Sequence, residues 1–135
     1  AGNAQQASRP PYNRAEPGRG TKMKCTLKRT GEVLAQEVEV ADTYFTRLKG
    51  LMFRRTMKEG TGLLLDPCPQ IHTCFMRFSI DAIFFDKNGL VLYVAEQMKP
   101  WRFGRFVRGS RYTLELPGGS LAGRVQKGDE VILSE

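Results

Sequence analysis

QIHTCFMRFSIDAIFFDKNGLVLYVAEQM, residues 70–98, is the stretch that decides the fold. Within it, an apolar and aromatic run (80–86) and a returning run (90–96) flank Asn88-Gly89. Because both central residues of a type I′ turn need positive φ, Asn-Gly between two such runs predicts a tight β-hairpin. A hairpin this apolar must be covered on at least one face, and we expect it to be covered on both. The stretch therefore predicts a buried pair of strands around which the rest of the chain packs.

Further short strands are predicted on both sides of this hairpin. Residues 22–28 alternate between apolar and basic side chains, and the run 34–40 is expected to pair with them as a second hairpin. Shorter runs that are typical of strands follow at 63–65, 112–116 and 131–133. Many short strands separated by turns predict a mainly β fold, a compact antiparallel β-sandwich or jelly-roll-like barrel with one short helix.

The one helix is expected over residues 44–52, with Asp42 or Thr43 as its N-cap. Gly50 is expected to interrupt this helix or to let it approach a strand closely. Four apolar residues fall at helical spacing and are expected to pack onto the sheet, namely Phe45, Leu48, Leu51 and Met52.

The chain has 135 residues, which is enough for one domain with a core and too few to predict two. Residues 1–21 are rich in Pro, Gly, Gln and Arg, which predicts a disordered basic tail before a single β domain over 22–135. No apolar run approaches the roughly 20 residues that cross a bilayer as a helix. The net charge of +7 favours anionic partners or surfaces.

The strongest candidate for a partner surface is KPWRFGRFVRGSR, residues 99–111, which is basic and aromatic and contains no acid. Its candidate residues are Lys99, Trp101, Arg102, Phe103, Arg105, Phe106, Arg108 and Arg111. Cations interleaved with rings suit single-stranded nucleic acid or an anionic envelope surface, although no RNP sequence accompanies them. The alternative is a solvated loop whose rings cover one end of the β domain, and the sequence leaves both interpretations open.

Two carboxylates are predicted to lie in buried positions. Asp81 begins an apolar strand, and Glu115 stands between two leucines. Because an unpaired buried charge is very unfavourable, each carboxylate needs a partner, and Arg47 and Arg54 are the natural candidates. We expect at least one Arg–Asp pair to tie the helix to the sheet. The functional alternative is that these four residues line a polar pocket.

One cluster is similar to a metal site, formed by Cys68, His72 and Cys74. On a strand, His72 and Cys74 would point the same way, but a closed zinc site needs four ligands. The fourth ligand would have to come from Asp66, Asp81 or Cys25. We therefore expect no cofactor and no catalytic residue, and a structural role for the cluster. The alternatives are zinc, Cys/His nucleophilic chemistry, and a Cys68–Cys74 disulfide in an exported protein.

Several short motifs occur in one order: Arg47-x-x-Gly50-Leu51-Met52-x-Arg54, Gly62-x-Leu64, Ile71-His72-Thr73-x-x-Met76, Ile80-Asp81-x-x-Phe84, Leu114-Glu115-Leu116-x-Gly118 and Gly128-Asp129. Over roughly 25–133 they closely resemble the prokaryotic family called domain of unknown function 192. The resemblance implies an all-β, jelly-roll-like fold with a short helix. Family members often look exported or anchored at the cell envelope, and no activity or ligand is established for them, so the resemblance implies no catalytic residues.

These observations favour a non-catalytic binding or accessory module, a monomer associated with the cell envelope, with residues 99–111 as its partner surface. The partner is expected to be an envelope protein or an anionic surface. Two alternatives remain open. One is a zinc or Cys/His-dependent protein, and the other is a binder of single-stranded nucleic acid or another anion through 99–111.

Overall fold

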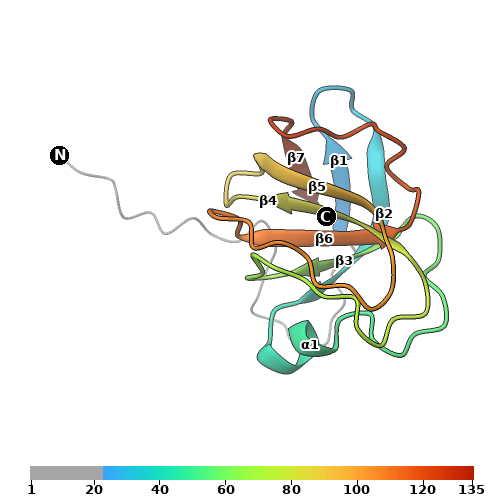
Figure 1. The fold of residues 1–135 in the computed structure, drawn as a ribbon. Helices are drawn as coiled ribbons and strands as arrows, with labels where there is room; N and C mark the ends of the chain where they lie inside the picture. The colour runs from blue at the N-terminus through green and yellow to red at the C-terminus, as the bar shows by residue number, and fades with distance from the viewer. Residues whose placement is uncertain (1–22) are drawn as a thin grey trace.

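The computed structural model describes residues 23–135, so the tail predicted at 1–21 lies outside the described residues. Seven strands and one helix lie within this part of the chain (Figure 1). Their bounds are β1 Met23–Leu27, β2 Val33–Ala41, α1 Tyr44–Lys49, β3 Thr61–Leu65, β4 Ile80–Phe85, β5 Val91–Met98, β6 Tyr112–Pro117 and β7 Val131–Ser134. The prediction of a mainly β fold with one short helix is confirmed.

The central hairpin is formed by β4 and β5, which pair antiparallel. Its turn is not of type I′, because Gly89 has positive φ and Asn88 does not. The Asp86 carboxylate instead accepts the N–H groups of Asn88 and Leu90 at 2.8 and 3.0 Å. Glycine is needed for a second reason, since a Cβ at position 89 would collide with the carbonyl oxygen of Val131.

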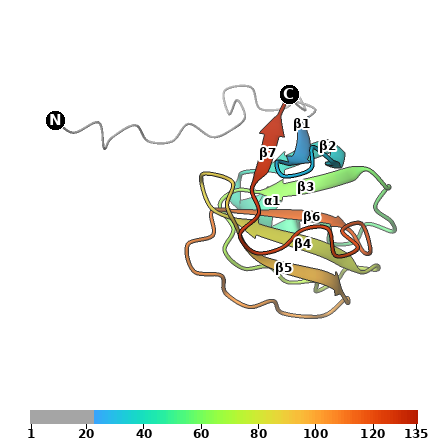
Figure 2. The same ribbon diagram turned by 90° about the horizontal axis from the view of Figure 1, so that it is seen from above.

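All seven strands form one curled sheet, a half-barrel, in the order β5-β4-β6-β3-β2-β1-β7 (Figures 1 and 2). Strands β2 and β3 are parallel, whereas the other neighbouring pairs are antiparallel. Parallel neighbours need a crossover connection, and the segment 42–60, which contains α1, supplies it. The predicted antiparallel sheet lacked this parallel pair.

Helix α1 is shorter than the predicted range 44–52 and ends at Gly50, which has a φ of 44°. Thr43 is the N-cap, as predicted. Its hydroxyl oxygen accepts the N–H of Thr46 at 3.2 Å, and the Thr46 hydroxyl oxygen accepts the N–H of Thr43 at 3.1 Å. This reciprocal capping box satisfies donors that a helix N-terminus otherwise leaves free.

The apolar side chains of α1 do not all reach the sheet. Phe45 is 78% exposed and Leu48 is 51% exposed, so the prediction that they pack onto the sheet is wrong. Leu51, just beyond the helix, is buried. A helix of six residues makes fewer than two turns, so only the end of the segment comes down onto the sheet.

The sheet buries an apolar core on each face. The first core includes Met23, Cys25, Leu27, Val38, Leu64, Ile83, Phe85, Leu114, Leu116 and Val131. The second core includes Leu51, Leu63, Leu65, Ile71, Met76, Ile80, Ala82, Phe84 and Val107. Every residue of β4 is buried, so this strand of the hairpin is covered on both faces as predicted. The other strand, β5, lies at the edge of the sheet and is mostly half-buried or exposed.

Two loops lie together against the second core, and we call them the loop ribbon, residues 69–73 and 101–107. Backbone hydrogen bonds join the two loops, among them one from the N–H of Gly104 to the carbonyl of Ile71 at 2.9 Å. The loop ribbon therefore brings the predicted partner surface and His72 of the Cys/His cluster to the same face of the sheet.

Candidate functional site

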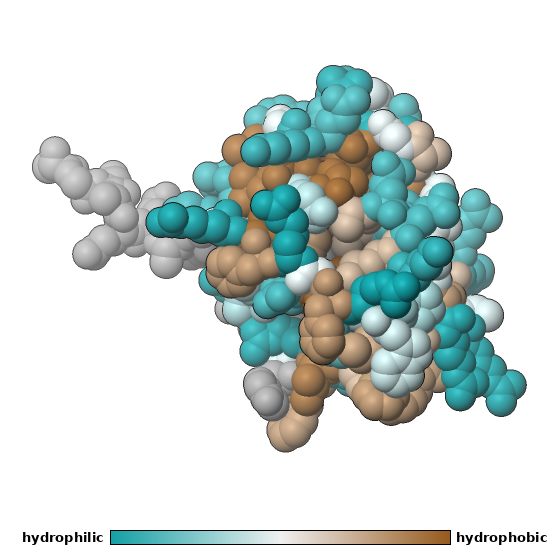
Figure 3. All heavy atoms as spheres, in the orientation of Figure 1, coloured by the Kyte–Doolittle hydropathy of each residue, from teal (hydrophilic) through white to brown (hydrophobic). Residues whose placement is uncertain are grey.

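The predicted partner surface is exposed along most of its length. Trp101, Phe103 and Phe106 are 58%, 81% and 61% exposed. The exposed cations beside them are Lys99, Arg102, Arg105 and Arg108. Figure 3 shows brown apolar side chains among teal hydrophilic ones on one face of the molecule. Large apolar side chains rimmed by charge mark interaction surfaces more often than ordinary solvated loops.

A buried threonine that the sequence analysis did not single out holds the start of this loop. The Thr73 hydroxyl donates to the carbonyl of Lys99 at 2.6 Å and accepts the N–H of Arg102 at 2.8 Å. The Thr73 carbonyl also accepts the N–H of Trp101 at 2.9 Å. Thr73 is fully buried, so water does not compete for these bonds. One side chain thus fixes the backbone that presents the aromatic surface.

Three aromatic residues from three separate loops meet beside this anchor, and we call Phe53, Phe75 and Trp101 the aromatic cluster. The ring centroids of Phe53 and Phe75 lie 5.4 Å apart, and those of Phe75 and Trp101 lie 4.7 Å apart. All three residues have positive φ, at 66°, 62° and 62°. A bulky residue there is strained by about 1–2 kcal/mol, so surrounding contacts must hold each one. Phe53 and Phe75 carry no sequence signal that would have marked them.

The arginines of the predicted surface have different roles. The Arg105 guanidinium lies 4.8 Å from the ring centroid of Tyr93. The Arg105 side chain remains exposed at the surface. Arg111 donates from Nε to the fully buried Asp66 carboxylate at 2.8 Å. Because a buried carboxylate needs this partner, Arg111 has a role in the fold that the structure does not give to Arg105.

A hollow of about 420 Å³ lies between the loop ribbon and β5. Its lining includes Tyr93 and Glu96 from β5, and Arg102, Phe103 and Arg105 from the loop ribbon. This volume falls in the range of about 300–1,000 Å³ that holds organic ligands. The hollow therefore offers rings and guanidinium groups to one and the same occupant.

Asp81 is fully buried, and none of the arginines within residues 23–135 forms an ion pair with it. Its carboxylate accepts three backbone N–H groups, from Gln97 at 2.7 Å, Gly119 at 3.1 Å and Leu121 at 2.9 Å. The prediction that Asp81 pairs with an arginine of the helix is therefore wrong. The carboxylate instead joins the end of β5 to the turn after β6.

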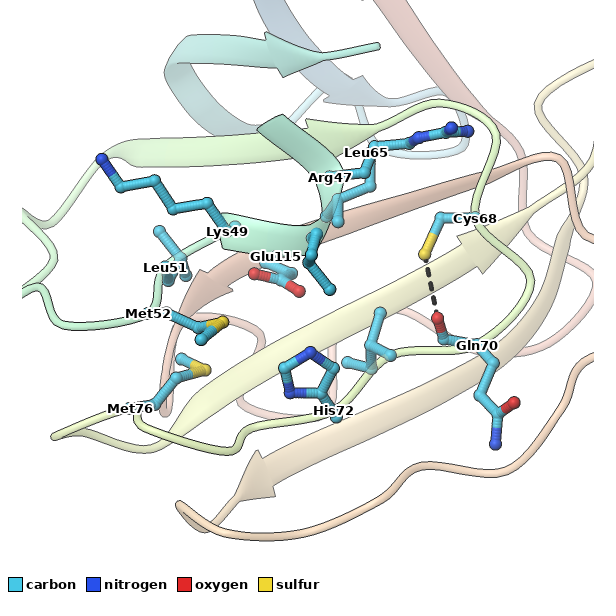
Figure 4. A pocket seen from close by; sticks show the side chains of 13 residues that line it. Arg47, Lys49, Leu51, Met52, Leu65, Cys68, Gln70, His72, Met76 and Glu115 are labelled. Atoms are coloured by element: carbon cyan, nitrogen blue, oxygen red, sulfur yellow. Dashed lines mark hydrogen bonds between the residues drawn. The ribbon is translucent and has the colours of Figure 1, made fainter. Parts of the chain in front are cut away.

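Glu115 lies on β6 with 3% of its surface exposed. Burial raises the pKa of Glu115 to about 8, and the positive charge of Arg54 opposes part of that rise. Its Oε2 atom is buried without a hydrogen-bond partner among the described residues. Glu115 lines a cavity of about 50 Å³ enclosed by the end of α1, the sheet and the loop ribbon (Figure 4).

The two arginines predicted to pair with buried carboxylates bond elsewhere. Arg47 lines the same cavity as Glu115, but its Nη1 donates to the carbonyl of Pro67 at 3.1 Å. Arg54 pairs with the exposed Glu39 at 3.2 Å. The structure therefore brings only Arg47 and Glu115 of the four predicted polar residues to one cavity.

Within residues 23–135, Cys68, His72 and Cys74 form neither the disulfide nor the zinc cluster that the sequence left open. All three cysteines are free, and within residues 23–135 no group of three or more His, Cys, Asp and Glu side chains could hold a metal ion. The Cys68 thiol donates to the carbonyl of Gln70 at 3.0 Å, and His72 Nδ1 accepts the N–H of Cys74 at 3.2 Å. Burial raises the pKa of Cys68, and it raises the pKa of Cys25 to about 12. Both buried thiols are therefore weak nucleophiles at neutral pH.

The chain is a small, mainly β domain. Its fold is defined by the half-barrel sheet, the helix between the parallel strands β2 and β3, and the loop ribbon. Residues 25–133 match the family DUF192, described as an uncharacterized ACR, and the chain belongs to this family. This match confirms the resemblance seen in the sequence motifs. Among the described residues, no helix is long and apolar enough to cross a membrane.

Relatives of known sequence include UPF0127 proteins from archaea. One from Thermococcus sibiricus is 34% identical over 68% of this chain, and the match spans 62% of that protein's length. One from Pyrococcus furiosus is 34% identical over 75% of this chain and 90% of its own. These proteins are similar to this chain, and their names assign no activity.

Two solved structures share the fold with a TM-score of 0.69 each. One, from Sinorhizobium meliloti, is provisionally described as a transcription regulator; it is 24% identical and covers 81% of this chain and 89% of its own. The other, a protein of unknown function from Novosphingobium aromaticivorans, is 22% identical and covers 96% and 99%. At these identities the likeness concerns the fold alone.

Proposed function

We propose that this protein is a non-catalytic binding module that takes an anionic partner through one surface, which we call the aromatic–basic surface. It consists of Phe53, Phe75, Lys99, Trp101, Arg102, Phe103, Arg105, Phe106 and Arg108. The observation that carries the proposal is the exposure of large rings on a backbone that a buried threonine holds fixed. Exposed rings are unfavourable in water, and a fixed loop loses little entropy on binding.

The charge of this surface favours an anion. Arg102, Arg105 and Arg108 are exposed, and no acidic residue lies between positions 97 and 111. Guanidinium groups bind phosphate and carboxylate well because their planar donors match those groups. Glu96 at the edge of the hollow is the nearest acid along the chain, so the surface keeps a positive balance.

The test compares two triple charge reversals with the same change in net charge. The first replaces Arg102, Arg105 and Arg108 with Glu, and the control replaces the exposed Lys58, Lys87 and Lys127 with Glu. Binding is measured to phosphatidylglycerol vesicles, to a fluorescent single-stranded oligonucleotide and to a poly-glutamate peptide. We expect at least one probe to bind, and the first variant to lose at least about tenfold more affinity than the control. Equal losses in the two variants would reject the surface.

A second candidate function is binding of single-stranded nucleic acid. Exposed rings that can stack on bases favour it. In that case the oligonucleotide binds with an affinity that falls steeply with salt, and Trp101→Ala weakens binding at high salt as well as at low salt.

An accessory role at the cell envelope is part of the same proposal and is supported by the family resemblance. Fractionation of cells that carry the natural gene tests it. Recovery of the protein with membranes or with the periplasmic contents supports an envelope location, and recovery with the cytosol contradicts it.

A further inference from the structure

Two methionines point their thioether groups into the cavity beside Glu115. Met52 follows the end of α1 and Met76 follows the loop ribbon, and both line the cavity of about 50 Å³. Figure 4 draws both thioether groups toward the hollow, which the Glu115 carboxylate and the His72 ring also line. The aromatic–basic surface does not use these groups.

The loops that carry the methionines are tied together by their next neighbours. The N–H of Phe53, which follows Met52, donates to the carbonyl of Phe75, which precedes Met76, at 3.0 Å. The two rings also lie 5.4 Å apart. These contacts therefore hold the backbone next to Met52 and the backbone next to Met76 together, which is part of the preorganisation that a ligand site needs.

The buried Glu115 side chain indicates that the cavity lacks a group to compensate one carboxylate oxygen. Its side chain is 3% exposed and its Oε2 atom has no hydrogen-bond partner among the described residues. A buried carboxylate oxygen without a partner is unfavourable unless a proton or a cation compensates it. The Arg47 side chain lines the cavity but points away from this oxygen (Figure 4), toward the carbonyl of Pro67.

The size and the donor set of the cavity favour a bare ion. A volume of about 50 Å³ is too small for an organic ligand, since such ligands occupy about 300 Å³ or more. Carboxylate, imidazole and thiol groups do not form a metal-binding trio within residues 23–135, which disfavours zinc. Two thioethers and an imidazole form a soft donor set, and soft donors select Cu(I).

We propose that Met52, Met76 and His72 bind one Cu(I) ion, and that the Glu115 carboxylate balances its charge. This site is separate from the aromatic–basic surface and does not rest on the function proposed above. Copper enters and stays as Cu(I), so binding transfers no electron. The proton that the buried Glu115 carries before binding leaves for solvent as the ion enters, so the charge balances. Met76 is 4% exposed, so the ion would be shielded from bulk water on the Met76 side.

Coordination requires one rearrangement at His72. Its Nδ1 atom accepts the N–H of Cys74 at 3.2 Å, so the neutral ring carries its proton on Nε2. When Nε2 binds the ion, that proton leaves Nε2 and Nδ1 becomes protonated. The Cys74 N–H then loses its acceptor. This change of tautomer is a signature that adventitious binding at the surface would not produce.

The first test is NMR of the full chain with ¹³C-labelled methionine methyl groups, titrated with Ag(I) as a redox-inert substitute for Cu(I). The chain has five methionines. We expect the methyl signals of Met52 and Met76 to shift together and saturate at one equivalent, while those of Met23, Met57 and Met98 stay in place. The His72 ¹⁵N signals should show the change of tautomer at the same equivalence point. Shifts spread over all five methionines, or no shift, would overturn the proposal.

The second test measures Cu(I) affinity without oxygen by competition with bicinchoninate. Met52→Leu/Met76→Leu is compared with Met57→Leu/Met98→Leu, which makes the same chemical change outside this cavity. We expect the first variant to weaken binding at least about 100-fold and the control to change it less than about threefold. Cys68→Ser/Cys74→Ser should bind as the wild type does. Loss of binding in that thiol variant, or unchanged binding in the first variant, would assign copper to other groups.

Discussion

Phe53 and Phe75 are joined by a backbone hydrogen bond of 3.0 Å and by rings whose centroids lie 5.4 Å apart, although each belongs to a different loop. Both have positive φ, at 66° and 62°, and both remain about half exposed or more. An ordinary core contact would bury such rings. This pair instead holds two loops in register while presenting its outer faces to solvent, so it serves the geometry of the surface and of the cavity behind it.

The strain at Phe53 predicts an unusual order of stability. Phe53→Gly should be more stable than Phe53→Ala by about 1 kcal/mol, because glycine adopts positive φ without the clash of a Cβ. The measurement is the free energy of unfolding of both variants in urea. At Phe45, inside α1, the order should be reversed, with alanine more stable than glycine by about 1 kcal/mol. The same order at both positions would show that the backbone at Phe53 is relaxed.

Removal of the Asp81 carboxylate should destabilise the domain severely. Asp81→Ala leaves three backbone N–H groups without an acceptor, at about 1–3 kcal/mol for each buried group, and we expect it to unfold the chain. Asp81→Asn keeps one oxygen acceptor and should lose about half as much. Circular dichroism during thermal unfolding checks both, with Asp42→Ala as an exposed control. A stable Asp81→Ala variant would contradict the role given to this carboxylate.

Thr73→Val should loosen the backbone at the start of residues 99–111 while leaving the sheet intact. The valine keeps the shape of threonine but cannot bond to the Lys99 carbonyl or the Arg102 N–H. We expect a loss of about 1–3 kcal/mol and faster hydrogen exchange confined to residues 99–103. Thr56→Val, at an exposed position, is the control. Exchange that rises equally in β6 would indicate global destabilisation instead.

The pKa of Glu115 predicts how stability depends on pH. The pKa of Glu115 is about 8 in the folded chain, against an ordinary value of 4.5. Between these two pH values the folded chain keeps the proton on Glu115, whereas the unfolded chain has lost it. The free energy of unfolding should therefore fall as pH rises from about 4.5 to about 8, by up to about 1.4 kcal/mol per unit. Glu115→Gln stays neutral at every pH and should lack this component. Parallel pH profiles for the two proteins would contradict the assignment.

The sequence predicted the strands better than their surroundings. The alternating run at 22–28 and the uninterrupted apolar run at 80–86 both mark strands, and the structure has both hairpins. The hydrogen-bond partners of Asp81 were not predicted, because they are backbone N–H groups, which a pattern of side chains does not reveal. The exposure of Phe45 escaped it because an apolar residue at helical spacing looks the same whether a short helix lies on the sheet or beside it.

The candidate site was predicted only in part for the same reasons. The rings and arginines of 99–111 stand out in the sequence, and most of them are exposed in the structure. Phe53, Phe75 and Thr73 matter because loops far apart in the chain meet there, and no local pattern reports such a meeting. Arg111 looked like its neighbours in the sequence, yet its bond to Asp66 gives it a role in the fold.

The parallel pairing of β2 and β3 means that the segment 42–60 leaves the sheet and returns to it at neighbouring positions. That segment carries α1, Met52 and Phe53, so it supplies one wall of the cavity and one ring of the surface together. Substituting it with the corresponding segment of another member of the family would therefore change both features at once.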